Sequence, residues 1–234
     1  MGLVELLIII LLSIFQSIFG IGLLLIGTPT FLLLGYNFFD VLNFSITISL
    51  LQIIYSKETN LSFSKKMIIY CIPALILALY ILIKNENNIN IILLTSLTIV
   101  FFSLVNLSKF KDVVFNRDSD KKINISLILL GIIHGFTNLG GSLLTLISAN
   151  ISNNKDLMRY NIASGYLILG IVQLLFINTF YNTLVPSNLY YLYIPIISFF
   201  LAQYFYKRIN SQMFSRVLNI IVLIYGSYIF INNL

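Results

Sequence analysis

Long apolar runs separated by short polar loops make up almost the whole chain. Two of these runs, residues 3–35 and 123–150, are interrupted by glycines, and each is followed by three plainer runs. The plainer runs are residues 41–55, 67–83 and 89–107 in the first half and residues 160–178, 189–205 and 214–231 in the second. Because a helix needs about 20 apolar residues to cross a bilayer, the pattern predicts an all-α polytopic membrane protein with about eight membrane segments.

The interrupted runs are unsuited to a single straight crossing. Residues 3–35 would form a helix of about 50 Å, whereas the hydrocarbon core is about 30 Å thick. Glycine loosens a helix and proline removes a donor, so Gly20, Gly22, Gly27 and Pro29 are predicted to supply the break. In the second run the break is predicted at the sequence Asn138-Leu139-Gly140-Gly141-Ser142.

A shift of 118 residues aligns the two interrupted runs. The aligned pairs are Gln16 with His134, Gly20 with Asn138, Gly22 with Gly140, and Asn43 with Asn161. The correspondence fades further along, where Pro73 and Pro195 are 122 residues apart. Broken apolar segments at corresponding places of two halves indicate the binding site of a secondary transporter. We therefore expect a first repeat over residues 1–108, a linker over residues 109–122, and a second repeat over residues 123–234.

The basic residues of the loops suggest the topology. If every segment crossed once, they would divide eight to six between the two sides of the membrane. If both broken segments instead leave on the side where they enter, all basic residues except Lys84 fall on one side, as the positive-inside rule requires. Three crossings per half then make the repeats inverted, with a cytoplasmic linker and both termini outside. Two short tilted crossings per broken segment remain an alternative.

Composition narrows the class of protein. The chain is 59% hydrophobic and 9% charged, with a mean hydropathy of +0.97, which places it in a membrane and leaves no room for a soluble domain. The net charge of +6 lies in short loops and does not indicate nucleic-acid binding. With one histidine and one cysteine, the sequence suggests no metal site, cofactor or internal disulfide, and Cys71 is expected to be a small buried hydrophobe. The N-terminus lacks the features of a cleaved signal peptide and is expected to be retained.

The candidate binding residues lie at the two breaks. Half-helices that start inside the membrane expose N–H groups, which attract anions. The candidates are His134, Thr137, Asn138, Gly140, Gly141 and Ser142 in the second half, with Gln16, Gly20, Gly22, Asn43 and Asn161 completing the set. The alternative is that these small and polar residues serve only close helix packing. No arginine or lysine lies deep in a predicted span, so an anion would be held by backbone and neutral side chains.

Two further polar features have more than one interpretation. His134 is the only side chain with an unperturbed pKa near neutrality. It could carry a coupled proton or bind an anion, or it could be a neutral hydrogen-bonding group, as Gln16 in the matching position suggests. Residues 41–55 carry a polar stripe that is expected to face protein or water rather than lipid, formed by Asn43, Ser45, Thr47, Ser49 and Gln52.

The broken segments resemble the TauE/SafE family of sulfite and organosulfonate exporters, which is grouped with toluenesulfonate uptake permeases. The similarity lies in Gly20-Ile21-Gly22 with Pro29, and in Gly135 with Asn138-Leu139-Gly140-Gly141. The chain departs from the family pattern at Leu23, Leu24 and Ile147. The resemblance implies transport of small sulfur-containing or organic anions across the plasma membrane.

The expected function is therefore that of a secondary transporter, not an enzyme, which moves a small anion by alternating access. A proton or cation could be coupled, and a homodimer is possible. An assembly or scaffold protein without a transported substrate is a second hypothesis. An intramembrane enzyme using Ser142 and His134 is a third, and it is disfavoured because no acid is placed to orient the histidine and the pattern G-x-S-x-G is absent.

Overall fold

A computed structural model of the chain describes residues 3–33, 38–85, 97–98, 120–152, 154–181 and 192–210. All of the regular structure in these residues is helical, which confirms the predicted all-α class. The predicted spans 89–107 and 214–231 lie outside the described residues, apart from residues 97–98. The number of membrane segments therefore stays a prediction.

In the first half, the broken run forms three helical pieces and the following runs form two longer helices. The elements are α1 (Leu3–Phe19), the π-helix η1 (Leu23–Gly27), α2 (Thr28–Leu33), α3 (Phe38–Ile54), α4 (Leu61–Lys66), the π-helix η2 (Met67–Cys71) and α5 (Ile72–Lys84). α4, η2 and α5 form one continuous helical segment, Leu61–Lys84. This segment begins earlier than the predicted span 67–83.

The second half repeats this order. The elements are α8 (Asp120–Thr137), α9 (Gly141–Ile151), α10 (Lys155–Tyr181) and α11 (Tyr193–Tyr206). Residues 120–122, predicted as part of the linker, instead form the first turn of α8. The acidic side chain of Asp120 suits this position, because carboxylates are favourable near a helix N-terminus.

The helix bounds of the two halves correspond at the offset found in the sequence. A shift of 118 residues carries the end of α1 at Phe19 onto the end of α8 at Thr137, and carries residues 23–33 onto α9. A shift of 122 residues carries the end of α5 at Lys84 onto the end of α11 at Tyr206. The two halves thus share helix boundaries as well as glycines.

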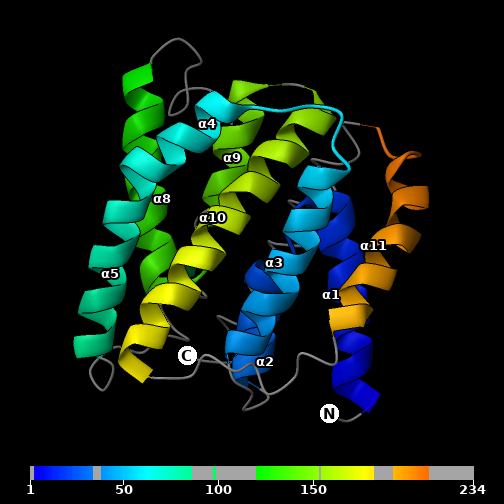
Figure 1. Cartoon of the computed structure of the whole chain (residues 1–234), viewed down its shortest axis with the longest axis horizontal. Helices are drawn as coiled ribbons and strands as arrows, with labels where there is room; N and C mark the ends of the chain where they lie inside the picture. The colour runs from blue at the N-terminus through cyan, green and yellow to red at the C-terminus, as the bar shows by residue number, and fades with distance from the viewer. Residues whose placement is uncertain are drawn as a thin grey trace.

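The helices pack in pairs that cross between the halves. α5 packs against α8 at one edge of the molecule, α1 packs against α11 at the other, and α3 packs against α10 between them (Figure 1). α1 starts at the lower end of the view, whereas α8 starts at the upper end. The equivalent helices of the two halves therefore run in opposite directions.

The breaks are shorter than predicted. Residues 20–22 and 138–140 interrupt the helices, whereas Gly27 ends η1 and Pro29 lies within α2, so neither of them breaks the chain. The prediction was wrong for these two residues because the helix changes its hydrogen-bonding register before the proline. The N–H of Gly27 donates to the carbonyl of Gly22, five residues earlier, at 3.1 Å. This is the π-helix pattern, in place of the four-residue spacing of an α-helix. η2 precedes Pro73 in the same way.

Two glycines of α8 bring it close to the segment formed by η2 and α5. A Cβ on Gly131 would overlap the carbonyl oxygen of Cys71, and a Cβ on Gly135 would lie 2.6 Å from the Cβ of Ala78. This is the small-xxx-small packing found between membrane helices. Gly135, which the family resemblance assigned to the glycine cluster, therefore serves helix packing. Cys71 is buried here, as predicted.

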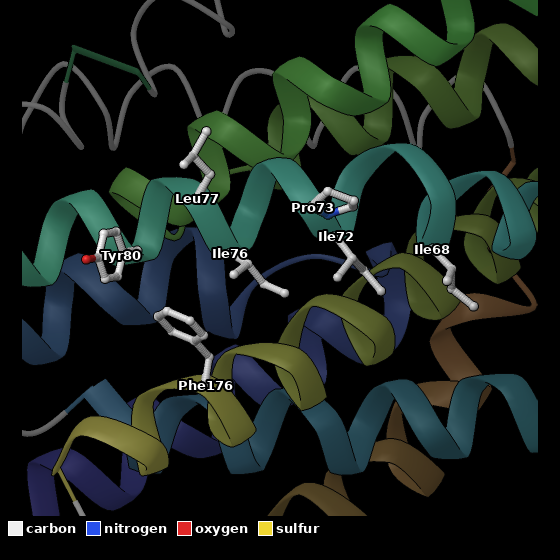
Figure 2. A pocket seen from close by; sticks show the side chains of 7 residues that line it. All are labelled: Ile68, Ile72, Pro73, Ile76, Leu77, Tyr80 and Phe176. Atoms are coloured by element: carbon white, nitrogen blue, oxygen red, sulfur yellow. The ribbon is translucent and has the colours of Figure 1, made fainter.

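Among the described residues, two helical segments are long and apolar enough to cross a membrane. They are Leu61–Lys84 and Lys155–Phe180, which contain 18-residue stretches with mean hydropathies of 2.3 and 1.7. Large apolar side chains also cover the outside of the helices, among them Leu11 at 66% exposure and Ile69 at 62%. Between α5 and α10 these outward side chains border an open groove of about 550 Å³, lined by Ile72, Ile76 and Phe176 among others (Figure 2).

The end of α4 and the starts of α8 and α10 lie at the upper end of the molecule in Figure 1, which we call the polar end. There Lys66, at the end of α4, forms an ion pair of 2.6 Å with Asp120 at the start of α8. Asn154, just before α10, donates to the carboxylate of Glu58 at 3.3 Å. The C-terminal end of α5, which carries Lys84, lies at the opposite end of the molecule (Figure 1).

Candidate functional site

At the first break the chain turns back on α1, and Gln16 holds the turn. A Cβ on Gly22 would lie 3.0 Å from the carbonyl oxygen of Leu12, so only a glycine fits against α1 here. The Gln16 side chain accepts a hydrogen bond of 3.1 Å from the N–H of Leu23, the first residue of η1. Its amide nitrogen donates to the Ser45 hydroxyl at 2.9 Å. Gln16 thus ties the restarted helix to α3.

The second break has the same geometry, with His134 in the place of Gln16. A Cβ on Gly140 would lie 2.7 Å from the Leu130 side chain, which shows that the chain turns back on α8. His134 Nδ1 accepts a hydrogen bond of 3.1 Å from the N–H of Gly140. Its Nε2 lies 3.1 Å from Oε1 of Gln173, on α10. Since Nδ1 accepts, Nε2 carries the proton and donates to Gln173. Both ring nitrogens are used in holding the break.

The two breaks also share a backbone conformation. Gly20 has φ +82° and Asn138 has φ +58°, and Asn138 is the one residue other than glycine with positive φ in the described part of the chain. Each follows the end of its helix, with an N–H bond of 2.7 Å to the carbonyl of Gln16 or His134. Asparagine tolerates this left-handed region better than most residues, which explains its presence where the first half uses glycine.

A direct hydrogen bond joins the two broken segments. Nδ2 of Asn138 donates to the hydroxyl of Thr28 at 2.8 Å, between residues that are 110 apart in the sequence. Both side chains are buried. The second amide atom, Oδ1 of Asn138, has no hydrogen-bond partner among the described residues. Thr28 was not among the predicted site residues, and its place at this contact makes it part of the candidate site.

The start of α9 lies against a tyrosine of α10. A Cβ on Gly141 would overlap the Tyr166 hydroxyl, so the tyrosine reaches the backbone only because the residue is glycine. The hydroxyls of Tyr166 and of Ser142 are buried and have no hydrogen-bond partner in the part of the chain that the structure describes. The N–H groups in the first turn of a helix also lack partners within that helix. The Tyr166 hydroxyl thus lies against the first turn of α9, which also carries Ser142.

The remaining predicted residues differ in their surroundings. Thr137 accepts a hydrogen bond of 3.1 Å from the N–H of Leu139 and so supports the turn. Asn161 is fully buried, and neither amide atom has a partner. It precedes Ile162, whose side chain would contact a Cβ on Gly20 at 3.0 Å. Asn43, its counterpart in the alignment, is only half-buried.

The polar stripe of α3 faces protein, as predicted, through part of its length. Ser45, Ser49 and Gln52 are buried. Gln52 donates a hydrogen bond of 2.8 Å to the carbonyl of Gln16, in the last turn of α1. The stripe therefore satisfies backbone and side-chain groups at the first break.

One charged residue that the sequence assigned to a loop is buried in the structure. α10 begins at Lys155, before the predicted start of the span at residue 160, and so includes Arg159. The Arg159 side chain is only 8% exposed. The predicted span, residues 160–178, began too late, because the apolar run marks only part of the helix. Arg159 lies near the start of α10, so it does not lie deep in the span. Packing against the ring of Tyr206, at 4.1 Å, covers the guanidinium group.

The structure does not join Ser142 and His134 by a hydrogen bond. His134 uses both nitrogens on Gly140 and Gln173, so neither bonds to Ser142. Within the described residues, no three side chains of the metal-binding types histidine, cysteine, aspartate and glutamate come together.

Comparison with models of protein families, with curated proteins and with solved structures finds no match to this chain. We therefore infer the function from the geometry of the site.

Proposed function

We propose that this protein is a secondary transporter that moves a small anion across the plasma membrane by alternating access. The observation that carries the proposal is the contact of two broken helices at Asn138 and Thr28, beside buried polar groups that have no partner. Unpaired polar groups are costly in a dry interior, and such groups usually have a function. A ligand that enters between the broken segments would satisfy them.

A membrane location is supported by the distribution of polarity. Large apolar side chains face outward, whereas glutamine, asparagine, serine and histidine side chains are buried around the breaks. This arrangement suits lipid on the outside and a polar pathway on the inside. The shared helix boundaries and opposite directions of the two halves favour inverted repeats, each with one re-entrant hairpin and, in full, three crossings.

The groups at the start of α9 favour an anion as substrate. The hydroxyls of Ser142 and Tyr166 can donate hydrogen bonds, and the start of a helix adds partial positive charge. Neutral donors bind an anion without a permanent charge pair, which allows release. Sulfite, a sulfonate or a related small organic acid fits this chemistry, in agreement with the family resemblance.

Flux measurements test the proposal. Purified protein reconstituted into liposomes should release entrapped sulfite or a small sulfonate with saturable kinetics, at a rate several-fold above protein-free liposomes. Liposomes that contain the Asn138→Gly variant are the matched control. Leakage equal to that of protein-free vesicles for sulfite, sulfonates and small organic acids alike would exclude the transporter and favour a scaffold role.

The orientation follows from the positive-inside rule, which assigns the polar end to the cytoplasm. In a Cys71→Ala background, single cysteines at Lys122 and Lys207 should react with a membrane-impermeant maleimide only after the cells are permeabilised. A cysteine at Asn85, beyond the end of α5, should react on intact cells. All three positions are exposed in the structure. Equal labelling of Lys122→Cys and Asn85→Cys on intact cells would contradict this topology.

A further inference from the structure

A cavity of about 230 Å³ opens at the polar end, between the end of α3, the start of α10 and the end of α11. Four basic side chains line it, and Asp156 is the acidic one among its lining residues. The basic residues are Lys57, Lys155, Arg159 and Lys207. The Asp156 carboxylate accepts a hydrogen bond of 2.6 Å from the Tyr206 hydroxyl. The cavity therefore carries a net positive charge.

Arg159 is the buried cation of this cavity. Asp156 and Tyr206 lie near enough to interact favourably with its charge. No carboxylate among the described residues forms an ion pair with it, however, and its Nε has no hydrogen-bond partner there. One terminal nitrogen donates to Oε1 of Gln203 at 3.3 Å, while Nε2 of Gln203 has no acceptor. A buried guanidinium is costly unless an anion compensates it, and its planar fork suits an oxyanion. Arg159 and Gln203 both line the cavity.

The cavity also reaches the first break. Gln52 lines it and donates to the carbonyls of Gln16 and Ser17, at 2.8 and 3.2 Å, in the last turn of α1. Its Oε1 is buried and has no partner. The cavity is therefore separated from the broken segment by one side chain. An anion held beside Arg159 would therefore lie close to the last turn of α1.

We propose that this cavity is a second anion site, in which Arg159 holds a small free oxyanion before it moves to the broken helices. The inference rests on the proposed transport function. The bound species is of the class of sulfite, sulfate or a small sulfonate. The exposed lysines at the rim, Lys57 and Lys207, attract the anion through their charge, and Arg159 and Gln203 bind it by hydrogen bonds.

Binding is measured with radiolabelled sulfite on the full chain in nanodiscs of phosphatidylcholine. Asn138→Gly should lose the site at the broken helices and keep the site at Arg159. In that background Arg159→Gln should weaken the remaining binding by about tenfold or more, the size of effect expected for a lost charged hydrogen-bond donor. Lys84→Gln removes a charge at the opposite end and should leave binding unchanged. Unchanged sulfite affinity in Asn138→Gly/Arg159→Gln would overturn the proposal.

Two further comparisons test whether the guanidinium group is needed for binding and whether the bound anion is a lipid headgroup. Arg159→Lys keeps the charge and the packing but lacks the guanidinium fork, so intermediate affinity is expected, and this variant serves if Arg159→Gln does not fold. Binding that requires an anionic phospholipid in the nanodisc would assign the cavity to a lipid headgroup and overturn the proposal.

Flux distinguishes this inference from the proposed function. Arg159→Gln should raise the sulfite concentration that gives half-maximal flux when sulfite is added at the polar end, and should leave it unchanged when sulfite is added at the opposite end. Equal flux of Arg159→Gln and the unchanged protein from both sides would reject the loading role and leave transport intact. Sulfite binding that depends on Arg159, without flux by the unchanged protein, would reject transport itself and leave an anion site.

Discussion

Asn138→Gly should reduce sulfite flux by at least about tenfold while the protein stays folded. Glycine adopts positive φ without strain, so the backbone turn at the second break is preserved. The variant loses the hydrogen bond to Thr28 and the free amide oxygen. Because these groups lie where the broken segments meet, their loss removes ligand contacts rather than packing. The expected loss corresponds to about 1.4 kcal/mol or more of transition-state stabilisation.

The structure shows why leucine is a poor choice at this position. Asn138→Leu would place a branched side chain at φ +58°, which costs about 1–2 kcal/mol in backbone strain alone. Loss of flux in that variant could follow from misfolding. Thr28→Val is a better companion, since it keeps the shape and removes the hydroxyl that Asn138 contacts. Flux per folded molecule that is unchanged in both Asn138→Gly and Thr28→Val would show that the contact is structural.

The positions of the breaks could be predicted because their signals are local. Glycines and polar residues interrupt apolar runs at residues 20–22 and 138–140, and the structure interrupts the helices there. The alignment of Gln16 with His134 also predicted that these two residues occupy equivalent positions at the two breaks, as the structure shows. It could not predict that each side chain accepts from the N–H of the restarting helix, since this depends on how tightly the chain turns back.

Thr28 and Arg159 could not be recognised because their surroundings come from distant parts of the chain. Thr28 is an ordinary residue of an apolar run, and only its contact with Asn138 distinguishes it. Arg159 precedes the apolar run of its helix, so hydropathy assigns it to a loop. The Arg159 side chain is buried by two rings of α11. The ring centres of Tyr206 and Phe199 lie 4.1 and 5.7 Å from its guanidinium carbon. Tertiary packing, not local sequence, fixes such features.

His134→Gln should preserve the fold, the flux and the pH dependence of flux, whereas His134→Leu should abolish folding or flux. Gln16 already performs the equivalent task at the first break, where its amide oxygen accepts from the N–H of Leu23. Glutamine at position 134 can accept from Gly140 in the same way. Leucine would leave that buried N–H and the Gln173 side chain without partners, at a cost of about 1–3 kcal/mol for each group.

This comparison separates proton transport from hydrogen bonding. A proton added to Nδ1 of His134 would face the N–H of Gly140, so a protonated histidine would break the turn that it holds. The geometry therefore favours a histidine that stays neutral throughout the transport cycle. Flux measured in liposomes between pH 5.5 and 8 tests this directly. If His134→Gln lowers flux and flattens its pH profile while its thermal stability matches that of the unchanged protein, the histidine carries the coupled proton.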